Sequence, residues 1–299
     1  MKLLPSLKQL EYLVALADTQ HFSKASKRCN VTPSTLSAGI RDLEHVLGVA
    51  LAERNNRRVL ITPLGVEIAQ RARQLLRDAE DIMELATSNR EPMTGDLRLG
   101  VIPTVGPFLL PRVLSVLNDR YPALRLFLEE DLTAPLLDRL RTGKIDVALI
   151  AMPYDTEAFA SKILFEDEFV FACHRHHPLS AKQAISVDDL REQPLMLLEE
   201  GHCLRTHALK ACQLQPSQGR SKFEASSFHT LVQMVASGIG VTLLPELAVD
   251  ARITDGTTIK LLPLVEKSCR RIGLVWRPSS PRGREFNALG DAMREIVAY

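Results

Sequence analysis

Three short apolar periodicities within the first 47 residues constrain the fold more than any other feature of this sequence. The third of them places four apolar residues on one helical face, at steps of four, three and four: Leu36, Ile40, Leu43 and Leu47. Thr32 followed by Pro33 is a typical helix start, because threonine caps the first turn and proline is tolerated at its first position. These patterns predict a first helix, a short second helix capped by Ser23, a turn, and a third helix over about residues 33–47.

Charge is unevenly distributed along the chain, although its net charge is only +1. Residues 1–77 hold twelve Lys and Arg against six Asp and Glu, a balance of +6, so the remainder carries −5. A basic N-terminal block fits nucleic-acid binding. Residues 52–62 indicate a small hairpin with a basic tip, which suits backbone phosphates. We therefore expect double-stranded DNA to be contacted by this hairpin and by the third helix, through Thr32, Pro33, Ser34, Thr35, Ser37, Arg41, Arg54, Arg57 and Arg58.

A small helical bundle with an ordinary polar surface would explain the three helices equally well. The order of short motifs favours DNA binding, because residues 7–65 resemble the winged helix-turn-helix of LysR-type transcriptional regulators. The matching motifs are Leu10-Glu11-Tyr12-Leu13, Phe22-Ser23-Lys24-Ala25-Ser26, Val31-Thr32-Pro33-Ser34-Thr35-Leu36-Ser37, Leu43-Glu44, Leu47-Gly48-Val49 and Thr62-Pro63-Leu64-Gly65. Many members have Gln-Pro where this chain has Pro33-Ser34, so a base contact through glutamine is not carried over.

A second apolar seam follows, at heptad-like steps of 4, 4, 3, 4, 3 and 4: Leu64, Ile68, Ala72, Leu75, Ala79, Ile82 and Ala86. It favours either a helix packed on its own domain or a helix paired with a second subunit. The LysR resemblance implies a linker helix that forms a homodimer, which assembles further into a homotetramer. We expect a DNA-binding domain over 1–62, a linker helix and hinge over 63–92, and a regulatory domain over 93–299.

Strand and helix signals alternate through the regulatory domain, which predicts an α/β fold. The resemblance implies two α/β subdomains similar in fold to periplasmic binding proteins. Subdomain I covers about 93–168 and 270–299, and subdomain II about 169–269, with chain crossings near 168–170 and 268–271. Ligands in such folds bind at the carboxyl ends of strands. Four hydroxyls hold such positions, each of them also a simple candidate for a helix cap: Thr104, Thr133, Ser226 and Ser227.

Two cysteines nine positions apart, Cys203 and Cys212, indicate a redox switch. The residues between them contain no Gly or Pro and favour helix. Nine helical residues rise about 13.5 Å, whereas a disulfide needs its α-carbons within roughly 7 Å. A bond between the two cysteines therefore requires the helix to open.

The cysteine segment also carries a more specific resemblance, to the hydrogen-peroxide-sensing branch of the LysR family. The matching stretches are Gly201-His202-Cys203-Leu204-Arg205 with Cys212, Ile102-Pro103-Thr104-Val105-Gly106-Pro107 and Gly240-Val241-Thr242-Leu243-Leu244-Pro245. By that resemblance, Cys203 is the peroxide-reactive cysteine and Cys212 the resolving one. The implied peroxide pocket consists of Thr104, Thr133, His202 and Arg205. Arg205 or a protonated His202 would favour the thiolate, whereas Thr206 stands where some members carry an acidic residue that could pair with Arg205.

Together these features predict a regulator that senses hydrogen peroxide through a reversible Cys203–Cys212 disulfide, which changes the arrangement of the oligomer on DNA and acts with RNA polymerase. The alternative is a LysR-type regulator that responds to a small metabolite in the cleft between the subdomains. A thiol peroxidase is disfavoured, because the chain has no Cys-x-x-Cys motif. The protein is therefore not expected to be an enzyme.

Composition excludes other classes of protein. No run of 18 or more apolar residues exists, so we expect no membrane partner, and the five cysteines do not suggest a structural disulfide framework. The expected location is the cytoplasm. Neither a cofactor nor a metal is expected. The histidines of His174-Arg175-His176-His177 would point to opposite faces of a strand, which does not suit a metal site.

Overall fold

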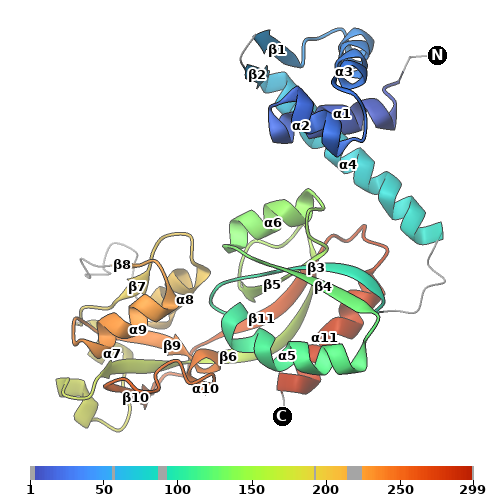
Figure 1. The fold of residues 1–299 in the computed structure, drawn as a ribbon. Helices are drawn as coiled ribbons and strands as arrows, with labels where there is room; N and C mark the ends of the chain where they lie inside the picture. Colours follow the sequence, from blue (N-terminus) through green and yellow to red (C-terminus); the bar gives the residue numbers. More distant parts are fainter. Residues whose placement is uncertain (1–3, 56–57, 87–92, 192, 214–223, 298–299) are drawn as a thin grey trace. The chain divides into compact units, whose positions relative to one another are not determined.

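The structure is a computed structural model that describes residues 4–55, 58–86, 93–191, 193–213 and 224–297. The chain divides into two compact units, Met1–Arg90 and Glu91–Tyr299, each described here by itself (Figure 1). Within the described ranges, no helix is long and apolar enough to span a membrane.

The N-terminal unit is built around three helices: α1 (Leu7–Thr19), α2 (Phe22–Arg28) and α3 (Pro33–Leu47). Their apolar faces meet in one core, whose fully buried residues include Leu13, Leu16, Leu36, Ile40 and Leu43. The predicted third helix and its cap are confirmed. Thr32 Oγ1 accepts a hydrogen bond from the Thr35 amide at 3.2 Å, and Pro33 takes the first helical position.

The start of α2 differs from the prediction. His21, not Ser23, is the cap, because its Nδ1 accepts a hydrogen bond from the Ser23 amide at 3.2 Å. Ser23 is the second helical residue, and its amide is one of the donors that a helix start leaves unpaired. The helix ends at Arg28, and the following Cys29 is buried in the core, as expected of a small apolar residue.

The predicted hairpin is confirmed as β1 (Ala52–Asn55) and β2 (Arg58–Ile61), which pair antiparallel. Glu44 on α3 holds its first strand, since Glu44 Oε1 accepts hydrogen bonds from the amides of Leu51 at 2.8 Å and Ala52 at 3.2 Å. A carboxylate at this position therefore connects the third helix to the hairpin.

Thr62 connects the hairpin to the long helix α4 (Pro63–Ala86). Its hydroxyl donates to the Ala50 carbonyl at 3.0 Å and accepts from the Gly65 amide at 2.9 Å. The helix start is thereby packed tightly on the chain that enters the hairpin. At Gly65 the backbones approach so closely that a Cβ would lie 2.3 Å from the Leu51 carbonyl oxygen.

Gly65→Ala is therefore expected to destabilise the N-terminal unit by about 1–3 kcal/mol, the usual cost of overpacking, despite the higher helix propensity of alanine. The obstacle is backbone, which cannot rotate aside as a side chain would. Thermal unfolding of the full chain, followed by circular dichroism, measures the loss. Val66→Ala at the neighbouring position, which is 45% exposed, is the matched control. A Gly65→Ala protein as stable as wild type would contradict the close approach.

The apolar seam predicted on α4 is divided between two environments. Of the seam residues, Ala72 is buried in the core of the N-terminal unit and Ile68 packs against it, as does the neighbouring Ala69, so this part of the helix packs on its own domain. Further along, Leu75 is 53% exposed and Ile82 is 65% exposed. Residues 87–92, in which the predicted linker ends as a hinge, lie outside the described residues.

The C-terminal unit alternates strands and helices. In chain order they are β3 (Gly95–Val101), α5 (Gly106–Arg120), β4 (Leu124–Glu130), α6 (Thr133–Arg141), β5 (Val147–Met152), β6 (Ala160–His174), the 3-10 turn η1 (Pro178–Ala181), α7 (Val187–Arg191), β7 (Leu197–Leu198), α8 (Cys203–Ala211), β8 (Glu224–Ala225), α9 (Phe228–Ala236), β9 (Thr242–Pro245), α10 (Glu246–Asp250), β10 (Ile259–Pro263), β11 (Cys269–Trp276) and α11 (Gly283–Val297). The α/β alternation is as predicted. The sequence pattern carries strand and helix signals for the other elements of this unit, but it does not predict η1, β8, α10, β10 and α11.

Among the described residues, seven strands form one mixed sheet in the order β10-β6-β11-β5-β3-β4, with β9 also paired to β6. β3 runs parallel to β4 and β5, whereas β11 is antiparallel to β5 and β6. The long strand β6 changes partners along its length (Figure 1): residues 160–168 pair with β11, and residues 169–174 pair with β9 and β10. Each half of the unit encloses its own apolar core, so the change of partner marks the crossing between them.

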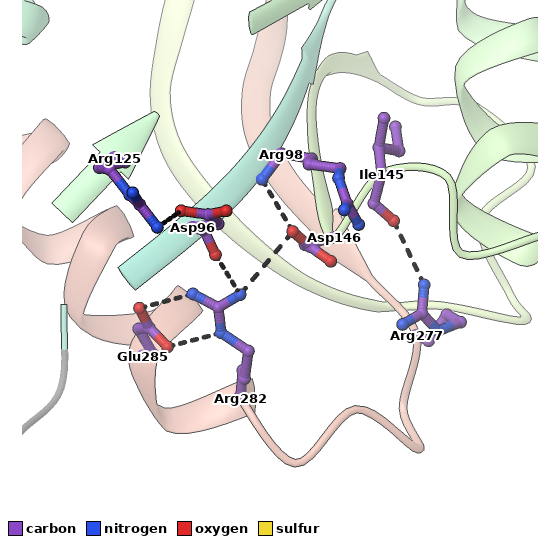
Figure 2. A network of polar contacts seen from close by, with 8 residues as sticks. All are labelled: Asp96, Arg98, Arg125, Ile145, Asp146, Arg277, Arg282 and Glu285. Atoms are coloured by element: carbon purple, nitrogen blue, oxygen red, sulfur yellow. Dashed lines mark hydrogen bonds and ion pairs between the residues drawn. The ribbon is translucent and has the colours of Figure 1, made fainter. Parts of the chain in front are cut away.

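A polar network fixes the start of β3, the first strand after the linker (Figure 2). Arg282 donates to both carboxylate oxygens of Glu285, at 2.8 and 2.9 Å, and to the Asp96 carbonyl at 2.8 Å. Asp146 accepts from the Arg98 amide at 2.7 Å and lies 3.7 Å from Arg282. The network joins β3, the residue before β5 and the start of α11, which lie far apart in the sequence.

Candidate functional site

A small pocket in the C-terminal unit lies where three segments meet. It is lined by Ile102, Pro103, Thr104, Leu132, Thr133, Gly201, His202 and Cys203, and the space between these residues is about 150 Å³ with open solvent included. Thr104 follows β3, Thr133 begins α6, and Cys203 begins α8. The fold therefore brings together four of the residues predicted to form a site: Thr104, Thr133, His202 and Cys203.

Cys203 is the first helical residue of α8 and is 7% exposed, with a free thiol. The first turn of a helix presents unpaired amide groups and the positive end of the helix dipole, which favour negative charge. A thiolate, not a thiol, is the nucleophilic form of cysteine. An oxidant that enters the pocket therefore meets the sulfur of Cys203 at the start of a helix.

Thr104 is held by a buried arginine that sequence reasoning missed. Arg270 on β11 is fully buried and donates to Thr104 Oγ1 through Nη1, and to the Thr104 carbonyl through Nη2, both at 2.9 Å. Because the hydroxyl oxygen accepts from Arg270, its own hydrogen can be donated elsewhere. Thr104 does not serve as the cap of α5, since the residue before that helix is Val105.

Asp167 on β6 balances the charge of Arg270. Its Oδ2 accepts from Arg270 Nε at 2.9 Å, and its Oδ1 accepts from the Leu247 amide at 2.9 Å. Asp167 and Arg270 stand beside the point at which β6 changes partners. The pocket is thus connected to the crossing between the two halves of the unit. The sequence holds no periodic signal for this pair, because each lies in a run of charged residues that suggests an exposed turn.

Thr133 carries a buried hydroxyl that lacks a hydrogen-bond partner. The residue is 1% exposed, and Thr133 Oγ1 finds no donor or acceptor within the described structure. Leaving a buried hydroxyl unpaired costs free energy, so such groups usually have a partner. The residue before α6 is Leu132, and Thr133 makes no capping bond. Its position in the lining of the pocket therefore indicates a polar ligand.

The remaining hydroxyls of the predicted cleft behave differently. Ser227 caps α9, since its Oγ accepts from the Thr230 amide at 3.2 Å. Neither Ser226 nor Ser227 is among the residues that line the described pocket. The simple capping interpretation is correct for Ser227 and wrong for Thr104 and Thr133.

His202 and Arg205 differ from their expected roles. Burial lowers the pKa of His202, against a raising effect of Glu199, so a neutral imidazole rather than an imidazolium faces the pocket near pH 7. Arg205 does not line the described pocket. Its guanidinium donates to the Leu198 carbonyl at 3.2 Å and to the carboxylate of Glu224 at 2.6 Å. Glu224 thus supplies an ion pair that residue 206, a threonine, does not offer.

Cys212 is the residue that follows α8, and it is fully buried with a free thiol. Burial raises the pKa of this thiol to about 12. The predicted helix between Cys203 and Cys212 is confirmed, and over nine residues it separates the two α-carbons by about 13.5 Å along its axis. In this form of the protein the two cysteines cannot bond.

The candidate DNA contacts gather at the start of α3. Thr32, Pro33, Ser34 and Thr35 are exposed, as is Arg41. Thr32 Oγ1 lies 2.8 Å from Ser34 Oγ and 2.8 Å from Thr35 Oγ1, so the hydroxyls form one exposed cluster. The remaining predicted contacts are Ser37, which is half-buried, Arg54 and Arg58, whose backbones belong to the hairpin, and Arg57, which lies outside the described residues.

The other cysteines and histidines form no further site. Cys173 is buried and Cys269 is exposed. His174 accepts a hydrogen bond from the His176 amide at 3.2 Å, and its ring lies 5.3 Å from the ring of His176. Within the part of the chain that is described, no group of three or more metal-ligating side chains is present.

Known proteins resemble this chain over both of its units. Residues 7–66 match the bacterial regulatory helix-turn-helix family of lysR type, and residues 90–298 match the LysR substrate binding domain. The transcriptional regulator EstR of Acinetobacter baylyi is 42% identical over 299 residues, which cover 100% of this chain and 99% of EstR. The hydrogen peroxide-inducible genes activator of Dickeya chrysanthemi is 41% identical over 292 residues, covering 97% and 95%. A full-length OxyR variant from Pseudomonas aeruginosa, a solved structure, has a TM-score of 0.80 and 37% identity, covering 97% of this chain and 98% of the other.

Proposed function

The chain belongs to the LysR family of bacterial transcriptional regulators, and we propose from this premise that it regulates transcription in response to hydrogen peroxide. The observation that carries the proposal is the pocket, whose lining includes both Cys203 at a helix start and the unpaired hydroxyl of Thr133. The sensing reaction is the reversible formation of a Cys203–Cys212 disulfide.

The chemistry needs only the two thiols and the peroxide. The Cys203 thiolate attacks one peroxide oxygen, the O–O bond breaks, and the departing hydroxide takes up a proton to leave as water. The sulfur is then a sulfenic acid. The Cys212 thiolate attacks that sulfur, the S–O bond breaks, and a second water leaves as the disulfide forms. Two thiols are oxidised and one peroxide is reduced.

The pocket supplies groups that hold the peroxide and its leaving oxygen. Thr104, oriented by Arg270, can donate its hydroxyl hydrogen, and the free hydroxyl of Thr133 can donate or accept. The neutral His202 offers one ring donor and one ring acceptor. These groups stabilise the negative charge that develops on the departing oxygen. Arg205 takes part indirectly, because its bond to Leu198 steadies the chain that leads into α8.

The lining of the pocket favours peroxide over the alternative ligand, a small metabolite. It brings the free thiol of Cys203 together with the hydroxyls of Thr104 and Thr133, groups that suit a small polar oxidant. EstR, whose name states no signal, and the peroxide activator differ by only one percentage point in identity to this chain, so overall similarity alone does not decide what this chain senses. The pair of cysteines on α8 carries the choice of peroxide.

The N-terminal unit supplies the DNA-binding function. The exposed start of α3, with Arg41, enters the major groove, and the hairpin contacts backbone phosphates. The exposed apolar residues on the second half of α4, including Leu75 and Ile82, pair with the same helix of a second subunit. Two such dimers form a tetramer, whose arrangement on DNA changes on oxidation and alters its contact with RNA polymerase.

A DNA footprint of the reduced and the peroxide-treated protein tests this function, with the redox state of each sample established by peptide mass spectrometry. The proposal requires a Cys203–Cys212 cross-link after low peroxide, and a footprint that changes with it. A metabolite-responsive regulator would show no linked disulfide, and titration of free thiols before and after peroxide would count the same number.

Thr133→Val offers a sharper test of the pocket. Valine has nearly the shape of threonine but no hydroxyl, so the free energy of unfolding should be unchanged or slightly raised, since an unpaired buried hydroxyl is removed. Oxidation of Cys203 should slow by about 10- to 100-fold, the equivalent of one hydrogen bond to a charged group in the transition state. Rates are measured by mass spectrometry after timed quenching with a thiol-alkylating reagent.

Ser227→Ala is the matched control for this variant and should show the opposite pattern. It removes a hydroxyl that caps α9 and lies outside the pocket, so it should cost about 1 kcal/mol of stability. The oxidation rate of Cys203 should not change. Wild-type oxidation kinetics in Thr133→Val would contradict the role of Thr133.

A further inference from the structure

His207 is a buried histidine inside the cysteine segment that the proposed reaction does not use. It lies on α8, four residues after Cys203 and five before Cys212, and is 5% exposed. Its Nε2 lies 3.1 Å from the carbonyl oxygen of Pro153, in the connection between β5 and β6. Its Nδ1 is buried without a hydrogen-bond partner in the described structure.

These contacts fix the protonation state of the ring. A carbonyl oxygen only accepts, so Nε2 carries the hydrogen and donates it to Pro153, and Nδ1 is unprotonated. Burial lowers the pKa of His207 most, and the charges of Arg270 on β11 and Lys210 on α8 lower it further, against a raising effect of the Pro153 bond. Protonation of the closed form would bury an unpaired N–H donor beside these two cations. The ring is therefore neutral near pH 7.

The bond to Pro153 crosses between the two halves of the C-terminal unit. Leu204 and Ala208, the neighbours of His207 on the helix, belong to the core of the second half. The strand β5, which leads to Pro153, is buried in the core of the first half. Cys203, at the start of α8, already packs in the core of the first half, and the His207 ring adds a polar bond from the middle of the helix to the same half.

We propose that His207 is a positioning residue that latches α8 in its closed, reduced form, so that the helix opens only when the Nε2–H···O bond to Pro153 breaks. Because His207 stands between the two cysteines, a rearrangement that brings their α-carbons within roughly 7 Å must displace it. The latch thus sets how readily Cys212 reaches an oxidised Cys203. The role of this latch in sensing rests on the proposed Cys203–Cys212 switch. The hydrogen bond of His207 to Pro153, by contrast, is a property of the reduced protein alone.

Acid is expected to release this latch. In the open form the ring recovers an ordinary pKa of about 6.5, whereas the closed form resists protonation. The open form therefore binds more protons, and the closed form loses stability as the pH falls below about 6.5. Opening should increase up to roughly tenfold between pH 8 and pH 5.5 through His207 alone. His202, at the start of the same helix, also has a lowered pKa and adds a separate contribution.

The test measures the opening of α8 in the reduced full-length chain. N-ethylmaleimide alkylates the buried Cys212 only when the helix opens, and peptide mass spectrometry gives the rate for that residue alone. Dividing by the rate of the urea-unfolded chain at the same pH removes the titration of the thiol itself. The resulting ratio reports opening and does not depend on peroxide.

Two variants separate the hydrogen bond from the titration. His207→Leu removes both, and should raise the ratio about 2- to 10-fold at pH 8, as expected for the loss of one hydrogen bond. In His207→Gln the side-chain amide can still donate to Pro153 but does not titrate in this range. At pH 8, the ratio of alkylation rates in His207→Gln should stay near that of wild type. Towards acid, this ratio should rise less than in wild type, because the contribution of His207 is missing. The same substitution at the exposed His229, on α9, is the control and should change neither value.

Equal ratios for wild type and His207→Leu at pH 8 would overturn the latch, as would an undiminished rise towards acid in His207→Gln. A second arm adds hydrogen peroxide and follows the Cys203–Cys212 peptide cross-link. Absence of the cross-link in wild type would count against the proposed function. Equal rates of cross-linking in wild type and His207→Leu would count against the latch alone. Circular dichroism establishes that each variant folds.

Discussion

Replacing Cys203 with serine is expected to abolish the response to hydrogen peroxide. Serine keeps the start of α8 and the shape of the pocket, but its hydroxyl cannot be oxidised to a sulfenic acid or form a disulfide. The variant should bind DNA with the footprint of the reduced wild-type protein and keep it after peroxide treatment. Transcription of a reporter gene under the bound promoter should no longer change with peroxide.

Two further cysteine variants make this result specific. Cys212→Ser keeps the reactive thiol and lacks the resolving one, so it should accumulate a sulfenic acid at Cys203 that dimedone captures. Cys269→Ser, at an exposed cysteine outside the pocket, should respond to peroxide like wild type. Peroxide-dependent transcription in Cys203→Ser would refute the proposed sensing reaction.

Asp167→Asn is expected to destabilise the C-terminal unit by about 3–5 kcal/mol, the usual cost of leaving a buried charge without its partner. The side chains of Asp167 and Arg270 are 1% and 0% exposed, so water cannot replace the lost carboxylate. Urea unfolding of the full chain can be followed through the fluorescence of Trp276, the single tryptophan, which is 5% exposed on β11. The midpoint should fall, and Cys203 should oxidise more slowly because Arg270 no longer holds Thr104 in place.

The adjacent residue provides the control for this prediction. Glu168 pairs with Lys267 at the surface, where the two side chains are 43% and 78% exposed, so Glu168→Gln should cost less than about 1 kcal/mol. A double variant, Asp167→Leu with Arg270→Met, removes both charges and should regain stability relative to Asp167→Asn. It should still oxidise slowly, since Thr104 has lost its donor. Equal free energies of unfolding for Asp167→Asn and Glu168→Gln would show that the buried ion pair of Asp167 and Arg270 does not stabilise the C-terminal unit.

The local elements were largely predictable because their signals lie within a few residues of each other. Thr32-Pro33 and the apolar face that ends at Leu47 define the third helix, and the absence of Gly and Pro after Cys203 predicts α8. The predicted cap of α2, Ser23, was wrong because serine and histidine side chains can both accept hydrogen bonds from the amides at a helix start. The terminal helix α11 was missed even though Phe286, Leu289 and Met293 carry a helical period.

The site was predictable only in part. The resemblance pointed to Thr104, Thr133, His202 and Cys203, and the fold brings these four together. Arg205 was misplaced, because whether an arginine turns towards a pocket or towards a carboxylate depends on Glu224, nineteen positions away along the chain. A single sequence holds no record of such a pairing.

By itself, the sequence determined where most of the helices and strands lie, which end of the chain is basic, and that Cys203 and Cys212 cannot bond across an intact helix. These properties follow from side-chain periodicity, charge and the fixed rise of a helix. Only the tertiary structure decided that Arg270 and Asp167 orient Thr104, that the hydroxyl of Thr133 is unpaired, and that His207 ties α8 to Pro153. Each of these contacts joins residues from distant segments, and burial rather than local sequence sets both their partners and their protonation states.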